Sequence, residues 1–271
     1  MLPGVHRKII PSVRQDESGP TIGGRWHMGV RLFVPAALLA ASLSGAADLA
    51  EFGLVGFSRD GSHVAWEEYG VQDGSGFPWA SLAVVEASSG ETVLADTLLL
   101  NLYSSGYPER WEDELDLVGL LRDSVRALLA PALDSLGIEE GRTGVALLTR
   151  LPTDASHYRT TEFVRQWWGP GYARGPRYML QLRCDTLGRE MMYNAPLVSL
   201  RLVLRASGEE LVLADDGADG APRAYWYRIR GVHMYGDSAL AVVLSKGLPG
   251  FEGPDTRWRV VARVLPEELR P

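Results

Sequence analysis

Most of the chain divides into short segments in which successive side chains point to opposite sides. In residues 62–69, Val64, Trp66 and Glu68 fall on one side and the residues between them fall on the other. Alternation of this kind, bounded by glycine turns, is typical of half-buried β-strands. Further candidate strands are residues 80–86, 92–100, 145–151, 177–184, 199–206, 225–232, 239–244 and 256–265. The sequence therefore predicts a mainly β fold of antiparallel strands.

The strands can be arranged in more than one way. Residues 58–61, Ser-Arg-Asp-Gly, are followed by two strands and a Ser-Gly-Glu turn, which resembles one blade of a propeller. A propeller repeats such a unit about every 40 residues, and only a faint second hairpin occurs at residues 199–213. A sandwich or an open, curved sheet is at least as well supported as a propeller-like sheet.

One segment has helical periodicity instead. In residues 114–136, apolar side chains such as Leu121, Val125 and Leu129 recur at spacings of three and four residues. This spacing predicts one substantial amphipathic helix with a buried face. Pro131 is expected to break or kink the helix, because proline removes a backbone donor. Gly137 is expected to end it.

The beginning of the chain has the pattern of an export signal. Residues 32–43 form a short apolar run, which follows Arg31 and precedes the small residues 44–47. This order is typical of a secretory signal peptide, and the run is shorter than the roughly 20 residues of a membrane span. We expect a signal peptide over residues 28–47, cleaved near Ala46 or Ala47. Residues 1–27 would be an upstream extension or a long n-region.

Residues 48–271 are then expected to form a single mainly β domain, periplasmic or secreted, with no membrane span. The whole chain has a net charge of −7, and removal of residues 1–46 takes away five basic and two acidic residues, which leaves −10. Nucleic acids and anionic membranes bind basic patches, so no nucleic acid partner is expected. Cys184 is the sole cysteine, which excludes an internal disulfide and a thiolate metal cluster.

Residues 69–79 are the strongest candidate for a binding site. Three glycines surround one acid and let backbone amides approach a ligand closely. Flanking aromatic side chains supply flat apolar contact area. The alternative is a long hairpin connection whose aromatic residues pack on the sheet. The candidate binding residues of this loop are Tyr69, Gln72, Asp73, Ser75, Phe77 and Trp79.

A second acidic segment, Phe251-Glu-Gly-Pro-Asp255, joins two predicted strands. We expect Glu252 and Asp255 to be acidic neighbours of the loop at residues 69–79. The paired acids of a glycosidase stand roughly 5–10 Å apart. A carboxylate-dependent hydrolase would therefore need Asp73 or Glu68 to meet one of these two acids across a single pocket. The simpler alternative is a proline-glycine turn with solvated acids.

Metal and catalytic patterns are otherwise missing from the sequence. An EF-hand around Asp73 is excluded, because the positions that would need acids hold Val71 and Leu82. An irregular calcium site of Asp73 with Glu67 or Glu68 is left open. Residues 215–219, Asp-Asp-Gly-Ala-Asp, could also hold a cation, and the simpler alternative is an acidic surface turn. The loop serine lacks the G-x-S-x-G spacing, and the histidines form no metal-binding pair. No cofactor and no catalytic residue is therefore expected.

Several motifs together resemble a known family. The longer ones are Gly56-Phe-Ser-Arg-Asp-Gly61, Glu67-Glu-Tyr-Gly-Val-Gln-Asp-Gly-Ser-Gly-Phe-Pro78 and Gly250-Phe-Glu-Gly-Pro-Asp255; the shorter ones are Ala130-Pro-Ala-Leu133 and Tyr227-Arg-Ile229. On these motifs the chain resembles a bacterial family of predicted secreted proteins, a domain of unknown function. The resemblance implies export and brings with it no activity and no site residues.

Three functional hypotheses follow. The export signal, the glycine-aromatic loop and the lack of catalytic spacing favour a non-catalytic envelope protein that binds an unidentified ligand or partner protein. The alternative is a carboxylate-dependent hydrolase that acts on envelope polymers. The third is a purely structural module.

Overall fold

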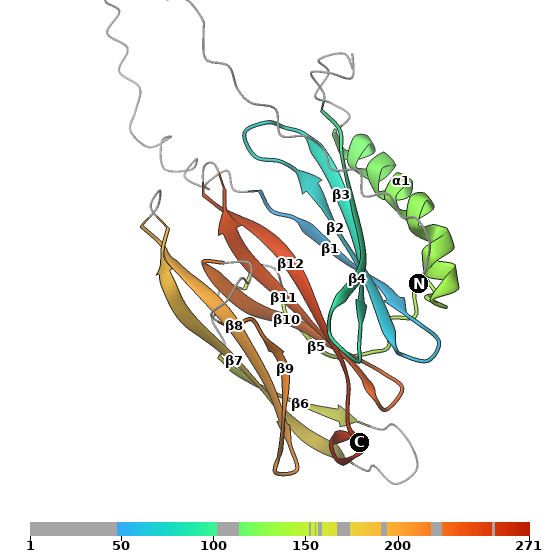
Figure 1. The fold of residues 1–271 in the computed structure, drawn as a ribbon, viewed down its shortest axis with the longest axis vertical. Helices are drawn as coiled ribbons and strands as arrows, with labels where there is room; N and C mark the ends of the chain where they lie inside the picture. The colour runs from blue at the N-terminus through green and yellow to red at the C-terminus, as the bar shows by residue number, and fades with distance from the viewer. Residues whose placement is uncertain are drawn as a thin grey trace, which may run out of the picture. The chain divides into compact units, whose positions relative to one another are not determined.

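The computed structural model describes residues 48–101, 114–151, 153–154, 156, 159–166, 174–190, 194–217, 224–250 and 253–271. Their strands form three four-stranded antiparallel sheets, in the orders β1-β2-β3-β4, β12-β11-β10-β5 and β6-β7-β8-β9 (Figure 1). The first sheet contains β1 (Glu51–Phe57), β2 (His63–Val71), β3 (Pro78–Glu86) and β4 (Thr92–Leu99). The second contains β5 (Val145–Thr149), β10 (Trp226–Tyr235), β11 (Ala239–Pro249) and β12 (Pro254–Val264). The third contains β6 (Thr160–Gln166), β7 (Arg174–Arg189), β8 (Pro196–Ala206) and β9 (Glu209–Asp215). The prediction of a mainly β, antiparallel fold is confirmed.

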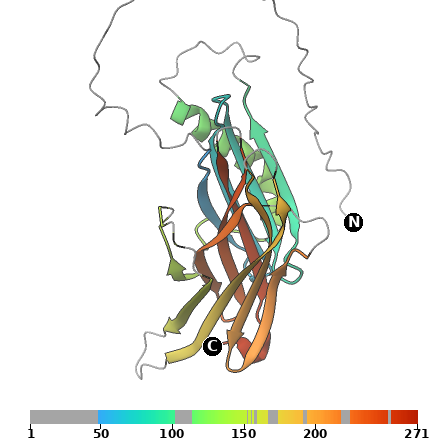
Figure 2. The ribbon, with the colours of Figure 1, turned by 90° about the vertical axis from the view of Figure 1, so that its left-hand side faces the viewer.

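The β12-β11-β10-β5 sheet is the middle layer, because apolar side chains cover both of its faces. On one face, Ala241, Val243 and Val260 pack with Phe57 and Val64 of the first sheet. The opposite face contributes to a larger core shared with the β6-β7-β8-β9 sheet. Strands with a period of two place alternate side chains on opposite faces, so β11 and β12 each contribute to two cores. In Figure 2 the third sheet lies nearest the viewer and the first sheet lies behind the middle one.

The helix α1 (Glu114–Ser135) covers the outer face of the first sheet. Leu121, Val125 and Leu129 are buried there against Ala65 and Leu82. The alternation expected for residues 62–69 is confirmed, since Val64 faces the middle sheet and Ala65 faces the helix. The helical face expected from the sequence is the face that is buried.

The end of α1 differs in part from the prediction. The helix continues through Pro131 to Ser135 and is not broken there. Proline removes one backbone donor near the last turn, and the apolar contacts of Leu133 with the sheet keep that turn in place. Gly137 ends the helix as expected: its φ is +65°, and Ile138 N–H donates to the Leu133 carbonyl oxygen at 3.0 Å, which is a C-terminal capping arrangement.

Two strands were not among the predicted ones, namely β1 and β6. The many glycines and prolines of residues 167–176 predict no regular structure there, and this prediction is wrong at its end, because β7 begins at Arg174. Residues 174–177 of β7 pair only with β6, and its pairing with β8 begins at Met179. Pro176 therefore lies where one edge of the strand has no ladder partner, as proline requires. The β8–β9 hairpin turns at Ser207-Gly208, with φ values of +54° and +88°, as the sequence predicted.

The connection after α1 crosses β1 at close range. A Cβ atom at Gly56 would lie 2.2 Å from the Glu139 carbonyl oxygen, so only glycine fits at this crossing. Gly141 N–H also donates to the Val55 carbonyl oxygen at 2.9 Å. The crossing leads the chain from the first sheet into β5 of the middle sheet. Within the described residues, no helix has the length and apolar character of a membrane span.

Candidate functional site

A pocket of about 580 Å³ opens between β1 and the middle sheet. Its floor is formed by β10, β11 and β12 on the face that packs toward the first sheet. One wall is the chain at Leu49–Phe52, and another is the segment that follows β5. The lining residues are Leu49, Ala50, Glu51, Phe52, Thr149, Arg150, Thr153, Trp226, Arg228, Arg230, Gly231, His233, Val243, Ser245, Thr256 and Trp258.

Strand β10 supplies the basic side chains of this pocket. Trp226, Arg228 and Arg230 alternate with Tyr227 and Ile229, which are buried in the core against the third sheet. A register shift between Ile229 and Gly231 marks a β-bulge at Arg230. Bulges of this kind re-aim a side chain and occur next to binding sites. The local fold thus turns one face of β10 into a cationic surface.

Arg230 is 6% exposed and has neutral hydrogen-bond partners. Its Nε donates to Ser245 Oγ at 2.8 Å, and its Nη1 donates to the carbonyl oxygens of Leu151 and Asp154 at 2.8 and 2.7 Å. Among the ion pairs of the described residues, none involves Arg230. Burial and the positive charge of Arg228 lower the pKa of Arg230, but an arginine stays protonated in a protein.

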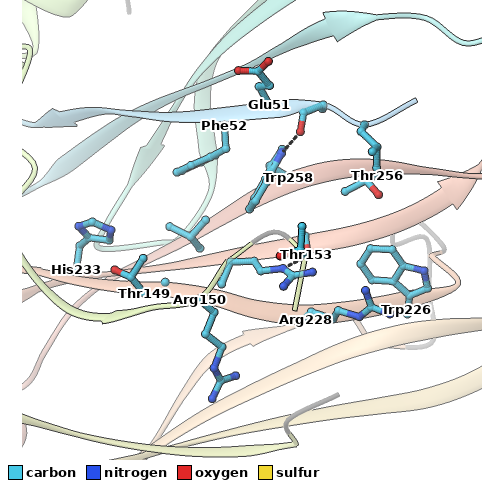
Figure 3. Close-up of a pocket in the computed structure, with 16 residues that line it drawn as sticks. Glu51, Phe52, Thr149, Arg150, Thr153, Trp226, Arg228, His233, Thr256 and Trp258 are labelled. Atoms are coloured by element: carbon cyan, nitrogen blue, oxygen red, sulfur yellow. Dashed lines mark hydrogen bonds between the residues drawn. The ribbon is translucent and has the colours of Figure 1, made fainter. Parts of the chain in front are cut away.

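Arg228 lies next to Trp226 at one end of the pocket (Figure 3). Its guanidinium carbon is 4.3 Å from the centre of the Trp226 ring, which is a cation–π contact. Gly247 makes room for this ring, since a Cβ atom there would lie 2.4 Å from Trp226 Nε1. Burial lowers the pKa of Arg228 as well.

Other charged side chains lie near these arginines. Arg150 contributes to the lining, but its Nη2 donates to Thr161 Oγ1 at 2.6 Å on β6. Among the described residues, the charge of Asp154 raises the pKa of both Arg228 and Arg230. Glu51 is the acidic residue of the lining, and Figure 3 shows its carboxylate pointing away from the arginines. The described lining thus contains three arginines and one acidic residue.

Phe52 and Trp258 form an aromatic wall opposite the arginines (Figure 3). Their ring centres are 4.9 Å apart. Trp258 is fixed by two hydrogen bonds: its Nε1 donates to the Ala50 carbonyl oxygen at 2.7 Å, and its backbone N–H donates to Glu68 Oε2 at 2.9 Å. The wall is thus held by both β1 and β2.

His233 lies at the end of the pocket away from Trp226. Its Nδ1 is 3.2 Å from the Thr143 carbonyl oxygen, and a carbonyl can only accept, so Nδ1 carries the proton. Burial lowers the pKa of His233. At neutral pH the positive charge of the pocket therefore comes from arginine.

Glu68 gives the pocket wall a pH-dependent component. Burial raises the pKa of Glu68 above its ordinary 4.5, although the Trp258 N–H opposes the shift. A raised pKa in the folded state favours folding below the unfolded pKa, and this contribution is lost as the pH rises through the folded pKa. In the variant Glu68→Gln the amide oxygen can still accept from the Trp258 N–H, but the side chain does not titrate. The free energy of unfolding of the wild type, measured relative to that of Glu68→Gln, should therefore fall between pH 4.5 and pH 7. Urea unfolding of both proteins at the two pH values measures this, and a constant difference would contradict it.

The loop at residues 69–79 is closed by its own hydrogen bonds. Gln72 N–H donates to the Phe77 carbonyl oxygen and Gly76 N–H to the Gln72 carbonyl oxygen, both at 2.9 Å. Ser75 Oγ donates to Gln72 Oε1 at 3.1 Å and accepts from Phe77 N–H at 3.3 Å. These contacts account for the polar groups of Gln72 and Ser75 within the turn.

The aromatic residues of this loop have different surroundings. Tyr69 is half-buried on β2, and Arg122 of α1 lies 3.9 Å from its ring centre. Trp79 is 5% exposed and belongs to the core between the first and middle sheets. Phe77 is half-buried. The predicted residues are therefore spread between a turn, a helix contact and a core.

The acidic residues of the two loops lie near each other. The charge of Asp73 is among the causes that raise the pKa of Asp255, of which burial is the largest. Arg257 joins this group: its Nη2 donates to Asp48 Oδ2 at 2.6 Å and lies 3.6 Å from Asp255 Oδ2. Glu252 lies outside the described residues. Neither Asp73 nor Asp255 lines the 580 Å³ pocket.

Within the part of the chain that the structure describes, no group of three or more His, Cys, Asp or Glu side chains is arranged to hold a metal ion. The irregular calcium site stays a prediction.

The sequence pattern did contain a sign of the pocket. Trp226, Arg228 and Arg230 alternate with apolar residues on one strand, and a strand face with one tryptophan and two arginines is unusual for a buried sheet. Charged residues are rarely buried without a partner, so this face predicts an edge or a binding surface. The contribution of the chain at residues 49–52 had no such sign.

The fold and the pocket define a mainly β protein of three antiparallel sheets with a cationic, aromatic-walled cavity on the middle sheet. The chain belongs to the family described as Predicted secreted protein (DUF2259), which matches residues 65–263. The match includes the pocket residues of β5, β10, β11 and β12, and it confirms the resemblance that the motifs indicated. No curated protein and no solved structure matches the chain significantly.

Proposed function

We propose that this protein is an exported, non-catalytic binding protein that holds an anionic ligand in the pocket on β10–β12. Export rests on the family of predicted secreted proteins and on the apolar leader pattern of residues 28–47, with cleavage near Ala46 or Ala47 and release to the periplasm or the medium. The observation that carries the binding function is Arg230, a buried arginine with neutral hydrogen-bond partners.

The energetics favour an anion in this place. Burying a charge is costly unless an opposite charge compensates it, and the net charge of the chain is −7. An acidic protein that gathers arginines around one pocket keeps them there at a cost in stability. A bound carboxylate or phosphate would offset this cost, and Arg is well suited to either group. The aromatic wall would contact an apolar part of the same ligand.

The carboxylate-dependent hydrolase has less support. Its acids need a common cavity, and Asp73 and Asp255 lie outside the one described above. The loop at residues 69–79 stays a candidate contact surface for a partner protein.

Calorimetric titration with phenyl phosphate, 3-phenylpropionate and neutral benzyl alcohol tests the proposal. We expect the two anions to bind and the alcohol to bind more weakly. Arg228→Gln should weaken anion binding about tenfold to a hundredfold, the range for a charged hydrogen bond. Arg183→Gln, which changes an exposed arginine on β7, is the matched control and should bind as the wild type does. Equal affinity for the alcohol and the anions, or equal effects of the two variants, would refute the proposal.

A further inference from the structure

The depth at which the charge lies restricts the ligand. Arg230 is 6% exposed, and its guanidinium is tied to Ser245 on β11 and to the carbonyl oxygens of Leu151 and Asp154. An anionic group that pairs with this arginine lies inside the pocket, and the remainder of the ligand lies along the other lining residues.

Two exposed leucines lie beside the lining residues. Leu49 lines the pocket from the β1 side and is 71% exposed. Leu151 follows the lining residue Arg150 and is 70% exposed, and its carbonyl oxygen accepts from Arg230 Nη1. Leu49 therefore adds exposed apolar surface to the lining.

Beside the arginines the lining is largely apolar. Phe52, Val243 and Trp258 line the cavity, and the hydroxyl groups of Thr149 and Thr153 are the small polar groups beside them. A volume of about 580 Å³ is that of a drug-sized ligand and greatly exceeds that of an inorganic anion. The pocket therefore places arginines beside a buried apolar surface.

We infer that the ligand is an anion with a single flexible alkyl chain. Its carboxylate or phosphate group pairs with Arg228 and Arg230, and its chain runs along Phe52 and Trp258 to Leu49. This inference rests on the proposed function, which it narrows to one class of ligand.

Chain length is the property to vary. Each buried methylene contributes about 0.8 kcal/mol, which corresponds to about a fourfold change in affinity. We expect alkyl carboxylates and alkyl phosphates from four to ten carbons to bind progressively more tightly, by about threefold to fourfold per methylene until the chain passes Leu49. Titrations are followed by calorimetry and by fluorescence of the pocket tryptophans, below the concentration at which each amphiphile forms micelles. The two head groups separate a fatty-acid source from a phosphate-ester source.

The head group is tested with decanol and decyltrimethylammonium. Both should bind at least tenfold more weakly than decanoate or decyl phosphate. Arg228→Gln should remove most of this preference and leave the dependence on chain length. Equal binding of the cationic and anionic amphiphiles would overturn the inference.

The outer end of the chain is tested with Leu49→Ser, which changes an exposed lining residue. This variant should weaken decyl phosphate about threefold to tenfold and leave butyl phosphate unchanged. Leu128→Ser changes another exposed leucine, on α1, and should bind both as the wild type does. If small aromatic anions bind in an Arg228-dependent manner but affinity does not rise with chain length, the alkyl-chain inference fails and the proposed function stands. If no anion binds in that manner, both fail.

Discussion

Replacing Trp79 with alanine is expected to lower the free energy of unfolding by about 3–5 kcal/mol, the usual cost of truncating a buried aromatic residue. Trp79 is 5% exposed and packs with Phe57 and Trp258 in the core between the first and middle sheets. Arg257 covers its ring at 4.6 Å. Chemical denaturation of the wild type and the variant gives the difference directly.

Two further variants sharpen this test. Trp79 Nε1 has no hydrogen-bond partner in the described structure, so Trp79→Phe should cost less than about 1.5 kcal/mol. Asp73→Ala should not lower stability by more than about 0.5 kcal/mol, because Asp73 Oδ2 is buried without a hydrogen-bond partner among the described residues, so its removal breaks no hydrogen bond there. An unchanged unfolding midpoint for Trp79→Ala would contradict its place in the core. If Trp79→Ala and Asp73→Ala both strongly lower the free energy of unfolding, the loop has a structural role and its predicted role in binding is wrong.

Removing both arginines that contact Glu67 is expected to cost about 3–5 kcal/mol, because it leaves a buried carboxylate without a counterion. Glu67 is 2% exposed. Arg122 Nη2 donates to its Oε1 at 2.5 Å, and Arg126 donates to both oxygens at 2.8 and 2.9 Å. The double variant Arg122→Met and Arg126→Met keeps apolar side chains of similar length on α1. Thermal and urea unfolding measure the loss.

The matched control adds Glu67→Met to the double variant. Replacing a complete buried ion group with apolar residues is often neutral or stabilising, so the triple variant should regain most of the lost stability. If the triple variant is as unstable as the double variant, the loss of stability comes from the shape of the new side chains and not from the unpaired charge of Glu67.

Local patterns predicted the strands and the helix where the periodicity was regular. The two sides of β2 and the glycine at the end of α1 were read correctly from neighbouring residues. Strand β1 has a register shift between Leu54 and Gly56, which interrupts the alternation and explains why no strand was predicted there. The stacking of sheets depends on contacts such as Asp48 with Arg257, which no local pattern reports.

The candidate site could be predicted only in part. The composition of the loop at residues 69–79 suggested exposed aromatic residues, but the burial of Trp79 depends on the middle sheet packing over it. The alternation of Trp226, Arg228 and Arg230 was visible in the sequence. The depth of Arg230 was not, because it depends on a bulge and on carbonyl oxygens of residues 151 and 154.

Glu67 and Glu68 are adjacent on β2, and their side chains point to opposite faces of the sheet. One accepts hydrogen bonds from α1, and the other accepts the backbone N–H of Trp258 in the pocket wall. Strand β2 therefore couples α1 to the pocket wall through two neighbouring residues. If α1 shifts along the sheet and Glu67 follows it, either the backbone between Glu67 and Glu68 changes conformation or Glu68 moves with its hydrogen bond to Trp258.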